Sequence, residues 1–70
     1  MPEFRVCALT GDGEKEGCKF FDYEEARRYG RIAARDNPKW DIIIKQDDVP
    51  IMKIVATYDD VRYIKLRDSR

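Results

Sequence analysis

The sequence predicts an α+β fold, a two-layer sandwich of the order ββαββ(β), with one helix packed on one face of a mainly antiparallel sheet. Several segments alternate apolar and polar residues with period two, which is typical of strands whose two faces differ. One segment, residues 23–36, has a helical period instead. Because one helix covers only one face of a sheet, the other face is expected to be open.

The first 22 residues predict a hairpin. Residues 4–10 alternate along one strand, and residues 18–22 form the second strand. Residues 10–14 between them include two glycines and an aspartate, which adopt positive φ at low cost and are typical of turns.

The register of this hairpin decides the state of the two thiols. If Phe4 lies opposite Phe20, then Cys7 and Cys18 point to opposite sides and cannot form a disulfide. A two-residue turn at residues 12–13 would instead set the thiols directly across from each other. That register spoils the hydrophobic pattern, so we expect free thiols, which are typical of the reducing cytoplasm.

Asp22 is the expected N-cap of a helix over residues 23–36, because its carboxylate can accept hydrogen bonds from the free amides of the first turn. Glu25 completes a capping-box pattern, and Pro38 ends the helix. The side of the helix that faces the sheet is made mostly of small residues, and Gly30 is expected where the helix backbone approaches a strand. This side comprises Tyr23, Ala26, Tyr29, Gly30, Ala33 and Ala34.

Three further strands are expected after the helix, at residues 39–45, 51–58 and 61–66. A short helix is the alternative for residues 61–66. The better core face of the resulting sheet carries most of the large apolar side chains. Its members are Phe4, Val6, Ala8, Cys18, Phe20, Trp40, Ile42, Ile44, Met52, Ile54 and Ala56.

Length and composition narrow the possible functions. The 70 residues are expected to form a single domain, 1–70, with a frayed tail at residues 68–70. The chain has no histidine, and its only serine is Ser69, so we expect no enzyme, no metal site and no cofactor. The 14 basic and 14 acidic residues balance, and no segment is apolar enough to span a bilayer, so we expect no membrane partner.

The open sheet face is the first candidate for binding a partner. Half of the residues assigned to it are apolar, which is more than a solvated face requires. One interpretation is a plain surface on which lysine stems cover isolated apolar residues. The other is a contiguous patch for another protein or for a second copy of the chain. The binding residues would be Leu9, Phe21, Ile43, Ile51, Lys53 and Val55.

A third interpretation gives the open face to single-stranded nucleic acid. Phe21 would stack on a base, and four basic residues would contact phosphates. One exposed aromatic residue and a balanced net charge make this the weaker alternative. The four basic residues are Arg5, Lys19, Lys45 and Lys53.

The outer face of the helix is the second candidate surface. Its arginines lie about one turn apart, and their guanidinium groups suit carboxylates and phosphates. A solvated face, partly neutralised by a Glu24–Arg28 pair, is the alternative. The arginines are Arg27, Arg28, Arg31 and Arg35. The sequence therefore predicts a small non-enzymatic protein-binding module, acting as an adaptor, regulator or inhibitor through one of these two surfaces.

Overall fold

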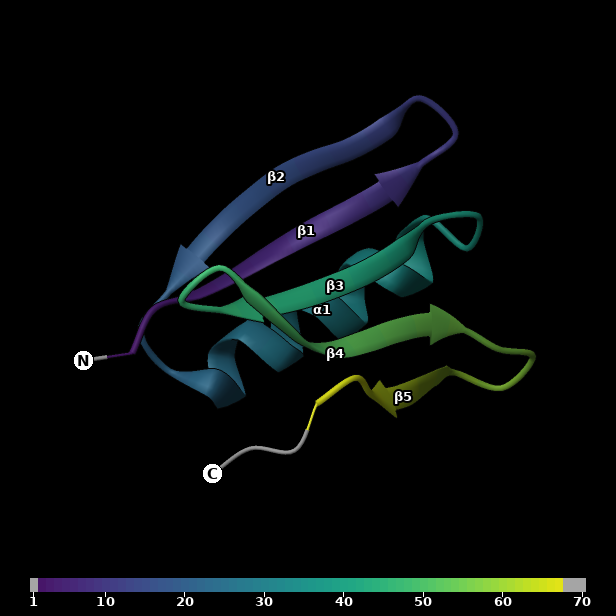
Figure 1. The fold of residues 1–70 in the computed structure, drawn as a ribbon. Coiled ribbons are helices and arrows are strands. Elements are labelled where there is room, and N and C mark those ends of the chain that lie inside the picture. Colours follow the sequence, from purple (N-terminus) through teal and green to yellow (C-terminus); the bar gives the residue numbers. More distant parts are fainter. Residues whose placement is uncertain (1, 68–70) are drawn as a thin grey trace.

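All five strands lie in one antiparallel sheet, and helix α1 covers one of its faces (Figure 1). The structure is a computed structural model that describes residues 2–67, so the frayed tail predicted at residues 68–70 lies outside the described residues. The strand order is β2-β1-β3-β4-β5, which confirms the predicted two-layer α+β arrangement. The elements are β1 (Phe4–Thr10), β2 (Gly13–Phe20), α1 (Tyr23–Asp36), β3 (Asp41–Gln46), β4 (Val49–Ala56) and β5 (Val61–Lys65).

Helix α1 spans the predicted residues and turns its small side to the sheet. Ala26, Gly30 and Ala34 are buried there. A Cβ built on Gly30 would lie 2.8 Å from Cδ1 of Ile54, which is closer than side chains normally pack. The missing side chain at Gly30 therefore allows the helix backbone to approach the central strands, as predicted.

The hydrogen bonds at the start of α1 differ from the prediction. Asp22 is the N-cap residue, but its side chain makes no capping hydrogen bond, so the predicted capping box is wrong. The Asp22 carbonyl accepts the first helical hydrogen bond, from the Ala26 amide at 3.1 Å. At the other end, the backbone and side-chain amides of Asn37 both donate to the Ala33 carbonyl, at 3.0 and 3.2 Å.

The hydrophobic core lies between α1 and the central strands. Ile42, Ile44 and Ile54 are fully buried there. Burying a large aliphatic side chain contributes about 1.5–3 kcal/mol, so these three residues account for much of the stability of so small a sheet. Cys18 was expected in this core but is exposed, because β2 is an edge strand. Around the buried cluster pack Ala8, Phe20, Tyr23, Ala33, Trp40, Ile51, Met52 and Val61.

Strand β2 is longer than the sequence predicted. It begins at Gly13, directly after a two-residue turn at residues 11–12, whereas the prediction placed its start at Cys18. The segment between Gly13 and Cys18 carries no large apolar residue, so its period-two signal is weak. Gly13 has a φ of 118°, a conformation that L side chains rarely adopt, which suits glycine at the end of the turn.

A β-bulge at Gly17 gives this hairpin its register. Phe4 lies opposite Phe20 as predicted, yet the turn has only two residues, because β2 contains one residue more than the segment of β1 that it faces. The irregularity lies opposite Val6, and a Cβ on Gly17 would collide with the Val6 carbonyl oxygen. On one side of the bulge the strands keep the predicted register, with Phe4 opposite Phe20, and on the other side Cys7 lies opposite Glu16. The alternative register, with a turn at residues 12–13 and Cys7 opposite Cys18, is wrong.

The bulge also separates the thiols, and both are free. Cys7 lies opposite Ile43 on the face away from α1. Cys18 lies near the helix, where it interacts with Tyr29 and raises the pKa of that phenol. The predicted absence of a Cys7–Cys18 disulfide is confirmed.

A second irregularity lies between Ile44 and Lys45 in the pairing of β3 with β4, and because of it Ile51 does not lie on the predicted face. Strict alternation predicted Ile51 on the open face. In the structure, Ile51 and its neighbour Met52 both pack against the core beside α1. The extra residue lies next to a two-residue turn in which Asp47 and Asp48 have φ values of 50° and 69°.

Residues 61–65 form strand β5, paired with β4, so the strand interpretation of this segment is confirmed and the helical alternative is wrong. The turn before it is closed by Thr57, whose amide donates to the Asp60 carbonyl and whose hydroxyl accepts from the Asp60 amide, at 3.0 and 3.1 Å. Strand β4 therefore ends at Ala56 rather than at the predicted Tyr58. No helix in the described part of the chain is long and apolar enough to cross a membrane.

Candidate partner-binding surfaces

The face of the sheet opposite α1, called here the open face, buries its central residues without a covering helix. Cys7 is only 1% exposed and Ile43 only 7%. Charged side chains from strands β1, β2 and β3 shield them. Lys45 Nζ lies 2.8 Å from Glu14 Oε2, and Arg5 Nη1 lies 3.1 Å from Glu16 Oε2. The aliphatic stems of such residues cover apolar surface while their charged ends meet at the solvent.

These ion pairs extend across the open face. Glu3 binds both Arg5 and Lys19, at 3.3 and 3.7 Å, and Lys53 lies 3.4 Å from Asp41. Each of the four basic residues that the sequence offered to phosphates therefore has a carboxylate partner. The sequence prediction missed Glu14 and Glu16 because it assigned their segment to a loop. With them the open face is close to electrically balanced, which removes the excess positive charge behind the nucleic-acid alternative.

The predicted apolar patch is dispersed in the structure. Ile51 packs under α1, and Ile43 is buried beneath the ion pairs. Phe21 is 58% exposed but follows the end of β2, so it lies outside the sheet. Leu9, 39% exposed, shares the open face with half-buried Val55.

Lys53 lies directly opposite Ile43 on the open face, at the centre of the sheet. Of the six residues predicted for this binding surface, the structure therefore brings together Leu9, Ile43, Lys53 and Val55.

The thiol of Cys7 is buried at the centre of this face. Burial raises the pKa of Cys7, and the nearby Lys45 ammonium only partly opposes the rise. A buried thiol with a raised pKa stays protonated and reacts slowly. The low exposed fractions of Cys7 and Ile43 show that the ion-paired layer keeps solvent away from the centre of the open face.

The second candidate surface is a groove between α1 and β5, about 300 Å³ in volume, called here the arginine groove. Three of the four arginines predicted on the helix line it, and Arg35 reaches it through Asp60. The other lining residues come from the start of α1, from the turn before β5 and from β5 itself. The lining comprises Glu24, Arg27, Arg28, Arg31, Asp60 and Tyr63.

Asp60 fixes the far end of the groove. Arg31 donates to its Oδ2 from both Nε and Nη2, at 3.1 and 2.8 Å, and Arg35 Nε lies 3.5 Å from its Oδ1. These hydrogen bonds raise the pKa of Arg31 further above its already high ordinary value. One carboxylate thus positions two guanidinium groups and neutralises one of them.

At the near end, Arg27 lies between a carboxylate and an aromatic ring. Its Nη2 is 3.5 Å from Glu24 Oε2, and its Cζ is 5.3 Å from the centre of the Tyr63 ring, within cation–π range. Glu24 therefore pairs with Arg27. The Glu24–Arg28 pair named from the sequence does not form. Arg28 is exposed, and no carboxylate among residues 2–67 forms an ion pair with it.

Asp60 and Tyr63 also belong to this surface, although the sequence pattern did not indicate them. The alternation within residues 61–65 carries the signal for Tyr63, because it places Val61, Tyr63 and Lys65 on the side of the sheet that faces α1. Asp60 had been assigned only to a turn. Its approach to the helix depends on the position of β5, which the alternation pattern does not give.

Comparisons with protein-family models, with curated proteins and with solved structures find no significant match for this chain.

Proposed function

We propose that this protein is a non-enzymatic protein-binding module that uses the arginine groove to dock an acidic segment of a larger partner, acting as an adaptor, regulator or inhibitor. The observation behind this proposal is a charge imbalance. Three of the four helix arginines pair with only two carboxylates, those of Glu24 and Asp60, and Arg28 has no ion pair among the described residues. On the open face, by contrast, four basic residues pair with four carboxylates. A carboxylate-bearing partner would complete the groove.

The way in which the arginines are held also supports docking. Asp60 fixes Arg31, and Tyr63 supports Arg27, so little side-chain freedom is lost when a partner binds. Arginine and tyrosine are among the residue types that most often dominate binding energy at interfaces. The open face fits this role less well, because a partner would have to displace existing ion pairs there. The free thiols suit a place of action in the cytoplasm.

A binding assay with a fluorescent peptide of eight alternating Glu and Gly residues tests the proposal. We expect saturable binding that weakens with added salt, because exposed charges are screened. Arg28→Glu should weaken binding about tenfold, since one favourable contact becomes a repulsion. Arg28 has no ion pair among the described residues, so its replacement should leave the fold intact.

Lys39→Glu is the matched control, since it makes the same change of charge at an exposed residue outside the groove. An equal loss of affinity in both variants would show that only the overall charge matters and would contradict the proposal. Binding of a dT oligonucleotide that Lys53→Glu abolishes and Arg28→Glu spares would instead support the nucleic-acid alternative on the open face.

A further inference from the structure

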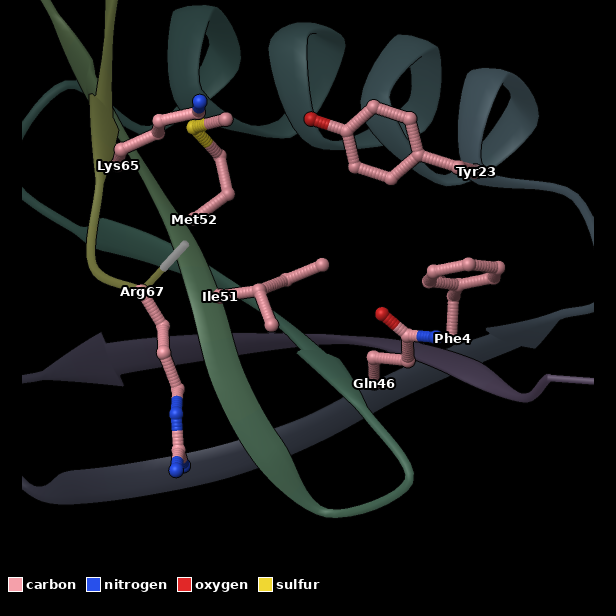
Figure 2. Close-up of a pocket in the computed structure, with 7 residues that line it drawn as sticks. All are labelled: Phe4, Tyr23, Gln46, Ile51, Met52, Lys65 and Arg67. Carbon is pink, nitrogen blue, oxygen red and sulfur yellow. The ribbon is translucent and has the colours of Figure 1, made fainter. Parts of the chain in front are cut away.

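A separate cavity of about 330 Å³ opens at the end of the sandwich where α1 begins (Figure 2). Its body is apolar. Phe4 and Tyr23 form one side, with ring centres 5.7 Å apart in an edge-to-face arrangement, and Ile51 and Met52 face them across the cavity (Figure 2). The irregularity in the pairing of β3 with β4 brings Ile51 into this lining, beside Met52.

The polar groups of the cavity are gathered at its edge. Figure 2 shows the Lys65 side chain and the Tyr23 hydroxyl pointing toward one another from opposite sides, past the sulfur of Met52. Gln46 lies at the other end, and Arg67 lines the rim with its guanidinium group pointing away. No carboxylate from the described part of the chain lines this cavity, and none forms an ion pair with Lys65.

We propose that this cavity binds a small amphipathic monocarboxylate, with its apolar body against Phe4, Ile51 and Met52 and its carboxylate at Lys65 and the Tyr23 hydroxyl. One ammonium group and one hydroxyl suit a single compact anionic head, and the apolar walls suit an aliphatic or aromatic body. The volume lies at the lower end of the range for small-molecule sites, which limits the ligand to about ten to fifteen non-hydrogen atoms. The arginine groove has no part in this site.

Octanoate and its neutral analogue octanamide test the charge and the apolar body separately. Titrations are followed by NMR through the methyl signals of Met52 and Ile51. We expect octanoate to shift these signals in a saturable way, with a Kd of about 1 mM or tighter, as ligand efficiencies for so small a molecule allow. Octanamide should bind about tenfold more weakly, and acetate, which has the charge without the apolar body, should cause no saturable shift.

Lys65→Met is the informative variant, because Lys65 is exposed and its loss leaves the core untouched. It should weaken octanoate about tenfold and leave octanamide unchanged, since only the carboxylate uses the ammonium group. Lys15→Met, an exposed lysine on β2 away from the cavity, is the matched control and should change neither affinity.

Equal affinity for octanoate and octanamide, or octanoate binding that does not respond to Lys65→Met, would overturn the proposal. So would a titration that leaves the Met52 and Ile51 signals in place. The arginine-groove variant Arg28→Glu should retain octanoate binding, which separates the failure of this site from the failure of the acidic-partner proposal.

Discussion

The two faces of the sheet bury their centres by different means. On one face Ile42, Ile44 and Ile54 pack against a helix whose small residues let it approach closely. On the other, Cys7 and Ile43 reach nearly the same burial beneath a layer of ion-paired side chains. A sheet without a second helix can therefore still be dry at its centre when long charged residues on different strands meet in pairs above it.

The largest expected effect comes from breaking the contact between helix and sheet. Gly30→Leu would force a side chain into the space now held by Ile54 Cδ1, and overpacking combined with displacement of the helix should cost more than the roughly 3–5 kcal/mol available to so small a domain. We expect a largely unfolded protein with no cooperative thermal transition in circular dichroism. Glu25→Leu, at an exposed position of the same helix, should melt like the parent. A native-like melting temperature for Gly30→Leu would show that the helix does not pack as described.

Chemical labelling of the two thiols tests how well the open face shields Cys7. At pH 8, iodoacetamide should modify exposed Cys18 first and buried Cys7 about a hundredfold more slowly, since Cys7 reacts only when the structure opens locally. Mass spectrometry of the peptides gives both rates. Equal rates would show that the ion-paired layer admits water freely. The expected pattern is slow labelling of Cys7 in the folded protein and labelling as fast as that of Cys18 in urea.

The raised pKa of Cys7 predicts that the folding stability falls in alkaline solution. Because burial raises the folded-state pKa above the value in the unfolded chain, the stabilisation is complete below about pH 8.5 and is lost as the pH rises through the higher folded value. Lys45, whose pKa is raised by its hydrogen bond to Glu14, acts in the same direction at higher pH. Urea denaturation between pH 7 and 10 should therefore show falling stability, and Cys7→Ala should make the decline less steep.

The smallest expected effect compares two adjacent residues of β3. Ile42→Val should cost about 1.5 kcal/mol, because the rigid core under α1 cannot close the space left by a methylene. Ile43→Val should cost about 0.5 kcal/mol, because the flexible stems of Lys45 and Lys53 can settle into that space. Urea denaturation of both variants measures the difference. Equal costs would mean that the charged layer packs as firmly as the helix does.

Periodicity was sufficient to predict the elements that carry large apolar residues. The bounds of α1 follow from its helical pattern and from the proline after it, and β5 follows from its β-branched and aromatic residues. The small side of the helix, with Gly30 at its centre, also predicted the side that packs on the sheet.

The irregular positions were beyond this kind of prediction. A bulge shifts every later residue of a strand to the other face, and nothing in the alternation shows where it occurs. For that reason Ile51 was assigned to the wrong face. Glu14 and Glu16 were left in a loop because the start of β2 carries no large apolar residue. The isolated Gly17 was the one available signal, since a glycine inside a strand often marks a bulge or a close backbone approach. The contact of Arg31 with Asp60 joins residues 29 positions apart, so it depends on tertiary packing alone.

The bulge at Gly17 also determines where this chain tolerates a change of length. On either side of it the strands pair regularly, and Gly17 is the surplus residue between two intact ladders. Deleting it would let Cys18 take the place opposite Val6 while Lys19 stays across from Arg5 and Glu16 across from Cys7. The glycine is thus a built-in spacer, and its removal would straighten the outer strand without turning a single neighbouring side chain over.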